Sequence, residues 1–287
     1  MKAAASFFGL GSIGSTYPCI WCIQPKSEFD TDKKLEGGDL KTIEFIRYYA
    51  KLYQEASSEH TGKKKLSSKD YYSCEKQPVD KHLSDKTVLL DVYPVPSLHT
   101  KLGIVNLLFD ILVLILNLHS ITVTAYDWAK ACGLLRDSYI GGQIQFNGRG
   151  CDTLLKNIDR LSSILNDHPF LIGICKPIVA CFEDFRAVKE SCFGMMQYPR
   201  YKKDIYRFAT SYFKLMDFCA EQRPKPIKLH VRPKVHATFL HIIQFLERKE
   251  KEGFINGLSF YSEQGIYFLK SKITLAYLTN SFLTFLC

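Results

Sequence analysis

The chain has 287 residues, a length that suffices for one large domain or two closely packed ones. Its composition, 46% hydrophobic and 13% aromatic, excludes a disordered polar chain. Its formal net charge of +9 fits a polyanionic partner, with an ordinary basic globular protein as the alternative. The ten cysteines are spread along a chain with ample core residues, and the segment 1–10 is too small for a cleavable signal peptide. We therefore interpret most of the cysteines as small buried side chains in a reducing compartment.

The first two segments differ sharply in composition. Residues 1–56 contain a C-x-x-C pair, Cys19 and Cys22, followed by apolar residues at helical spacing over 41–56. Residues 57–86 are polar and rich in Lys and Ser, which predicts a flexible basic loop. We interpret its lysine run as a solvated face, with a DNA contact as the alternative; the run comprises Lys63, Lys64 and Lys65.

Residues 87–287 are predicted to form a helical region. It opens with an extended segment over 88–96, which is β-branched and closed by two prolines. Apolar periodicity then predicts helices over 102–118, 126–135, 151–165, 177–189, 201–219 and 233–248. The glycines around residues 141–150 are interpreted as a turn and a helix start. The predicted fold class is mainly α with a small β contribution.

Two apolar stretches require a test for membrane insertion. The stretch 102–118 contains Asn106, Asp110 and Asn117, and it falls short of the about 18 to 20 clean apolar residues that a span needs. The stretch 273–287 is shorter and carries several Thr, Asn and Ser residues. We predict that both are buried helices and that the chain does not span a membrane.

The clearest chemistry lies in two pairs, Cys19 with Cys22 and His236 with His241, more than 200 residues apart. Thiolate and imidazole are preferred zinc ligands, and four of them close a tetrahedral structural site. In zinc fingers the two pairs are usually separated by only about 12 to 15 residues. The spacing in this chain therefore does not by itself establish a zinc site. One alternative is a redox C-x-x-C motif, although its usual βαβ context is missing here. The other is that the two cysteines are simply buried and the two histidines are hydrogen-bonded, without a metal.

The histidine spacing has a geometric difficulty. Residues five apart point about 140° apart on a regular α-helix. We therefore expect His236 to lie in a loose first helical turn, which Pro233 allows. A second candidate site is a set of basic residues interleaved with tyrosines, which either tracks a DNA backbone or forms a solvated helix face; its basic members are Arg200, Lys202, Lys203 and Arg207.

Several segments, taken in order, carry a resemblance that covers most of the chain. They are Tyr17-Pro-Cys-Ile-Trp-Cys22, Thr42-Ile-Glu-Phe-Ile-Arg-Tyr48, Pro96-Ser-Leu-His-Thr-Lys-Leu-Gly103, Phe146-Asn-Gly-Arg-Gly-Cys-Asp-Thr-Leu-Leu155, and the histidine pair with Phe245-Leu-Glu-Arg248 and Tyr261-Ser-Glu-Gln264. Together they resemble the catalytic core of Transib-type transposases and of the related catalytic subunit of the V(D)J recombinase.

This resemblance implies a partial RNase H-like recombinase core with a zinc-stabilised helical insertion. In the family, two Asp and one Glu bind two Mg²⁺-type ions for displacement at phosphate. A separate structural Zn²⁺ is implied on Cys19, Cys22, His236 and His241. The implied partners are DNA and a second copy of the chain or a full-length transposase relative. The implied location is the nucleus, with the cytoplasm as the alternative.

The chain departs from the family at the acidic residues. The first family Asp would lie upstream of the cysteine pair, where the chain has no residues, and the second would fall level with or just before Met1. Tyr267 aligns with the family Glu, and Glu263 is the catalytic candidate if the register shifts. We expect a transposase-derived DNA-binding fragment that is catalytically inactive. The alternatives are an active transposase whose Asp residues lie upstream, and a zinc-stabilised interaction module without a nucleic-acid role.

Overall fold

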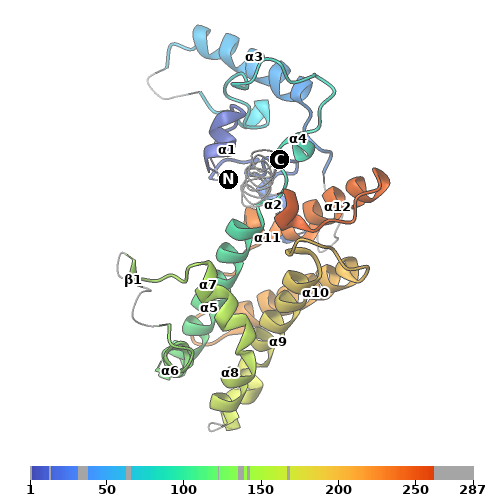
Figure 1. Ribbon diagram of the computed structural model, residues 1–287. Helices are drawn as coiled ribbons and strands as arrows, with labels where there is room; N and C mark the ends of the chain where they lie inside the picture. The colour runs from blue at the N-terminus through green and yellow to red at the C-terminus, as the bar shows by residue number, and fades with distance from the viewer. Residues whose placement is uncertain are drawn as a thin grey trace, which may run out of the picture. The chain divides into compact units, whose positions relative to one another are not determined.

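The computed structural model is mainly helical, as the apolar periodicity predicted (Figure 1). It describes residues 2–12, 14–31, 38–62, 66–121, 123–134, 139–140, 143–166 and 169–261. The chain divides into two compact units: unit 1 comprises Met1–Val95 and His230–Glu247, and unit 2 comprises Pro96–Leu229 and Arg248–Cys287. The histidine pair therefore belongs to the same unit as the cysteine pair, although the two pairs lie near opposite ends of the chain.

Unit 1 consists of one helix of 17 residues and several short helices and turns, joined by irregular segments and isolated β-bridges. Its elements are α1 (Lys2–Phe7), α2 (Lys26–Thr31), α3 (Ile43–Glu59), the 3₁₀ turn η1 (Lys69–Tyr71), α4 (Leu89–Val92), α11 (Pro233–His236), the π-helical turn η2 (Ala237–His241) and the first part of α12 (Ile242–Lys251). The predicted helix over 41–56 corresponds to α3. Thr42 starts this helix because its side chain accepts a hydrogen bond from the amide of Phe45 at 3.1 Å.

The segment 88–96 is only partly extended, so that prediction was wrong in its centre. Val88 is extended and forms a bridge with Thr42, but the single turn α4 follows it. Leu89 and Leu90 are both fully buried. Successive side chains of a strand point to opposite faces, whereas a helical turn lets both leucines enter one core, which accounts for the difference.

Unit 2 is built on long helices. Its elements are α5 (Ser97–Leu118), α6 (Val123–Ala131), β1 (Tyr139–Ile140), β2 (Gln143–Ile144), α7 (Gly148–Lys156), α8 (Ile158–Asn166), α9 (Pro169–Cys192), α10 (Tyr201–Glu221), the last part of α12, and α13 (Leu258–Tyr261). The helices α9 and α10 lie side by side, and α5 and α8 also pack on α9 (Figure 1). The strands β1 and β2 form an antiparallel pair. The strand content is therefore small, as predicted, but it lies in a segment for which the sequence predicted only a turn. Within the described residues this is the one sheet, and the RNase H-like core stays a prediction.

The helix predicted over 177–189 begins earlier than expected, because α9 starts at Pro169 and continues through Pro177. Proline lacks an amide donor and usually ends a helix. Here Leu171 and Cys175 are fully buried together with the later apolar residues of α9. Burial of this apolar face explains why the helix extends on the N-terminal side of Pro177.

Helix α5 is the apolar core helix of unit 2. It is the one described helix long and apolar enough to cross a membrane by composition, and half of the tested stretch is buried inside the fold. Its Asn106 accepts a hydrogen bond from the amide of Phe146 at 2.7 Å and donates one to the Phe146 carbonyl at 3.1 Å. A buried core helix meets the same length and composition test, so the absence of a span stays a prediction. The stretch 273–287 lies outside the described residues.

Candidate metal centre

The two pairs that the sequence singled out meet in unit 1 as a Cys2His2 cluster, which consists of Cys19, Cys22, His236 and His241. Their ligand atoms all lie within 4.8 Å of one another. The Cys19 Sγ is 3.1 Å from His241 Nε2, and the Cys22 Sγ is 3.3 Å from His236 Nε2. The two Nε2 atoms are 3.2 Å apart. The edges of a tetrahedral zinc site with two sulfur and two nitrogen ligands are about 3.3 to 3.8 Å, so the cluster has the size of a four-ligand metal site.

A π-helical turn brings the two histidines to the same face. His236 has ordinary helical angles, φ −54° and ψ −46°, so the expected loose first turn was wrong. The following turn η2 instead has the Ile242 amide bonded to the Ala237 carbonyl, five residues back. Such a turn is wider than an α-helical one and reduces the angle between the directions of residues five apart. Single π turns recur at functional sites, because they redirect a side chain without ending the helix.

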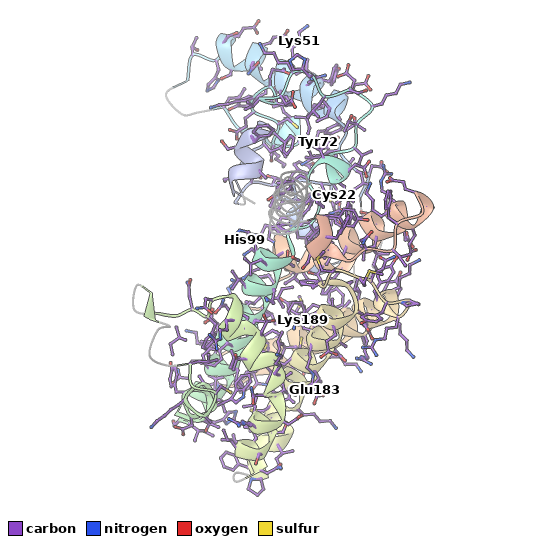
Figure 2. The ribbon with its side chains drawn as sticks, in the orientation of Figure 1. Cys22, Lys51, Tyr72, His99, Glu183 and Lys189 are labelled. Carbon is purple, nitrogen blue, oxygen red and sulfur yellow. The ribbon has the colours of Figure 1, made fainter. Side chains whose placement is uncertain are left out.

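The cysteine loop is held by main-chain and side-chain contacts. Cys22 forms an antiparallel bridge with Leu40 (Cys22 is labelled in Figure 2). The amide of Trp21 approaches the Cys19 Sγ at 3.4 Å, which turns the loop back over the sulfur. Lys41 is fully buried, and its ammonium donates to the Cys19 carbonyl at 2.7 Å. These contacts fix both sulfurs on one side of the loop.

The histidine rings are oriented by neighbouring side chains. The Nδ1 of His241 lies 2.7 Å from the Gln244 Oε1. Because an amide oxygen only accepts hydrogen bonds, Nδ1 carries the proton and Nε2 keeps its lone pair for a metal. The Phe29 ring stacks on the His236 ring, with centroids 4.0 Å apart and an interplanar angle of 6°. Sequence reasoning missed both neighbours. Gln244 could have been found from its position one turn after His241, whereas nothing local points to Phe29.

The protonation of the cluster favours a divalent cation. Burial raises the pKa of the Cys19 thiol, but contacts with Cys22 and the two histidines outweigh it and bring this pKa well below its usual range. The Cys19 neighbour and burial together raise the pKa of Cys22 well above its usual range. Burial lowers the pKa of His236 and keeps its imidazole neutral. The cluster therefore holds one thiolate readily, and a cation supplies the charge that lets the second cysteine ionise.

The remaining predicted site residues lie elsewhere. Arg200 precedes α10 and pairs with Asp204 at 3.2 Å, and Arg207 of α10 pairs with Asp184 at 2.5 Å. These bases line a hollow of about 720 Å³ together with acidic side chains, so the surface carries both signs of charge. The same hollow contains Lys203, while Lys202 lies near the Tyr201 ring. The lysines of 63–65 and Glu263 lie outside the described residues.

No protein-family model matches the chain, and no curated protein matches its sequence. The transposase resemblance therefore has no support from relatives, and the site is interpreted from its own geometry. Within the described residues, the Cys2His2 cluster is the one group of His, Cys, Asp and Glu side chains close enough together to hold a metal ion.

Proposed function

We propose that the Cys2His2 cluster binds one structural Zn²⁺ that stabilises unit 1. The observation that carries this proposal is the convergence of four buried ligand atoms within 4.8 Å. Two thiolates and two imidazoles match the preferences of zinc and fill a tetrahedral coordination sphere. The four side chains are only 0 to 3% exposed, so water or substrate has no open side from which to reach the ion. A closed four-ligand site is structural rather than catalytic.

The geometry favours metal binding over a redox role for the cysteine pair. A redox C-x-x-C presents at least one thiol to a partner, whereas Cys19 and Cys22 are 1% and 0% exposed. Each sulfur also faces a histidine nitrogen at 3.1 to 3.3 Å. In a disulfide these nitrogens would lose their sulfur partners in a buried place, where unpaired polar atoms are unfavourable.

Zinc at this site would join segments more than 200 residues apart, since 214 positions separate Cys22 from His236. Binding contributes on the order of 10 kcal/mol in zinc-finger peptides, which is comparable to the whole net stability of a typical domain. Apart from α3, the helices that lie wholly in unit 1 are short. We therefore expect this unit to lose its cooperative fold when the metal is removed.

The test is the metal content and thermal unfolding of the purified chain beside matched variants. We expect one zinc per chain in the wild type, and loss of zinc and of cooperative unfolding in Cys22→Ser and His241→Ala. Two controls should keep the metal: Cys74→Ser, a fully buried cysteine of the same unit outside the cluster, and His82→Ala, an exposed histidine.

A measurement on the unaltered chain covers the case in which both variants fail to fold. Cobalt(II) exchanged into the wild type should show the absorption of a tetrahedral ion with two sulfur and two nitrogen ligands. A wild-type chain purified with zinc present that retains no metal, or an octahedral cobalt spectrum, would contradict the proposal.

The second proposal is DNA binding by a transposase-derived protein, as the resemblance implies. Two observations support it: the net charge of +9, and the meeting of the two pairs that the resemblance assigned to one zinc. The proposal implies an RNase H-like fold for the family core, a nuclear location, and pairing with a second copy or a full-length relative. The proposal is limited to DNA binding; strand cleavage belongs to the alternative of an active transposase whose Asp residues lie upstream.

Fluorescence anisotropy with labelled duplex DNA tests this second proposal. We expect binding that weakens steeply between about 50 and 200 mM salt, because each phosphate contact releases bound cations. An absence of binding at the lower salt, by a chain that holds its zinc, would instead favour the interaction module without a nucleic-acid role.

A further inference from the structure

Two loops of unit 2 carry an exposed apolar surface that the metal centre does not use. One loop joins α9 to α10, and the other joins α12 to α13. Exposed apolar residues that are scattered singly are normal, whereas a contiguous group usually marks a docking surface. The group here, which we call the loop patch, consists of five residues that are 40 to 59% exposed: Met195, Met196, Tyr198, Phe254 and Ile255.

Main-chain contacts hold the two loops side by side. The Gln197 amide donates a hydrogen bond to the Ile255 carbonyl at 3.1 Å, and the Gly257 amide donates one to the Met195 carbonyl at 2.9 Å. Residue 257 must be a glycine for this approach, because a Cβ atom there would lie 2.4 Å from the Gly194 carbonyl oxygen. The residues of the loop patch therefore form one continuous surface although they come from distant parts of the chain.

The chain continues from this surface into an apolar segment. Ser259 of α13 contacts the α9–α10 loop, because its amide donates to the Gly194 carbonyl at 3.1 Å. Helix α13 ends at Tyr261, and residues 262–287 follow it outside the described residues. More than half of these residues are apolar. Their charged members are only Glu263, Lys270 and Lys272. A segment of this composition is driven to bury its apolar side chains.

The attachment point decides between this segment and a second copy of the chain as the occupant of the loop patch. Residue 262 follows Ser259 by three positions, so the segment begins within about 11 Å of the loop that Ser259 contacts. A segment tethered over such a distance acts at an effective concentration on the order of millimolar, which exceeds that of a separate chain in any dilute solution.

We propose that the C-terminal segment, residues 262–287, docks on the loop patch and covers it. The two methionines adapt their shape to an apolar partner, while Tyr198 and Phe254 offer large apolar faces. Docking removes the apolar surface of both the segment and the loop patch from water. The contact lies within unit 2, whereas the four ligands of the metal centre lie in unit 1, so this proposal does not depend on the zinc site.

Oxidation of the methionines by dilute peroxide tests the proposal on the unaltered full chain. Peroxide must reach the sulfur to form a sulfoxide, and mass spectrometry resolves each methionine. We expect Met195 and Met196 to oxidise at least tenfold more slowly in the folded chain than in urea, at a rate that does not depend on chain concentration. Rates close to those in urea would overturn the proposal. Protection that appears only at high chain concentration would also overturn it, because the occupant would then be a second copy.

Limited digestion with trypsin tests the same contact from the side of the segment. Lys270 and Lys272 are its trypsin sites. We expect slow cleavage there in the wild type and at least tenfold faster cleavage in Ile255→Asp, because a charge buried under the segment opposes docking. The matched control is Ile172→Asp, since Ile172 is 44% exposed and lies 20 residues before the end of α9, about 30 Å along the helix.

The control variant should be cleaved as slowly as the wild type. Fast cleavage after Lys270 and Lys272 in the wild type, or equal acceleration in both Asp variants, would overturn the proposal. Zinc content, measured on the same samples, should be equal in all of them, so that failure of this contact is separate from failure of the metal site.

Discussion

Gln244 is not a ligand of the metal centre but the hydrogen-bond partner of one, His241, so its substitution tests how that ligand is oriented. Its Oε1 lies 2.7 Å from the Nδ1 of His241, and this hydrogen bond holds the imidazole with Nε2 directed at the cluster. In Gln244→Ala the four ligands remain, but the ring loses its orientation and its preferred tautomer. Loss of such a partner lowers metal affinity about 10- to 100-fold, equivalent to about 1.4 to 2.7 kcal/mol. Because Gln244 is a neutral acceptor, we expect the lower end of that range.

The assay is competition for zinc between the folded chain and a chromophoric chelator of known affinity. Gln244→Glu is the matched control, because a carboxylate accepts from Nδ1 more strongly and should keep or raise the affinity. Wild-type affinity in Gln244→Ala would refute the argument that this bond orients His241. Equal loss in the Glu and Ala variants would also contradict the argument, because Glu keeps both the shape of the side chain and an acceptor oxygen for Nδ1.

Three further predictions follow from the same contacts. Zinc affinity should rise from pH 6 to pH 8 in chelator competition, because the pKa of Cys22 is raised without metal and its thiol must lose a proton on binding; a flat profile would contradict this. Leu112→Ala should cost about 2 to 5 kcal/mol in denaturant unfolding, because Leu112 is fully buried in α5, whereas Leu114→Ala, at a 46% exposed position, should cost far less; equal costs would argue against α5 as a core helix. Thr42→Ala should cost about 1 kcal/mol through loss of the α3 cap, and Thr42→Ser should restore most of it.

The mainly helical character and the four candidate ligands could be predicted from the sequence. Apolar residues at a period of 3.6 predict a helix, as in α3 and α10, because a helix buries one stripe of its surface. Ligand chemistry is a property of residue type, so Cys19, Cys22 and the histidine pair were recognisable without knowledge of their positions. The resemblance to transposases and the DNA partner stay predictions, because neither relatives nor contacts in the described residues test them.

The tertiary structure decided everything that depends on which distant groups meet. The π turn before His241 extends over only five residues, too few to alter the apolar pattern, so the sequence favoured a loose turn instead. Lys41 is polar and would be expected at the surface, yet its full burial depends on a carbonyl 22 residues earlier. Arg207 resembled a free DNA contact until the packing of α9 against α10 supplied Asp184 as its partner. The local sequence pattern determines which segments form helices and which side chains are able to bind a metal. The ion-pair partners of charged side chains and the orientation of the metal ligands depend on contacts between distant residues, which form only in the folded chain.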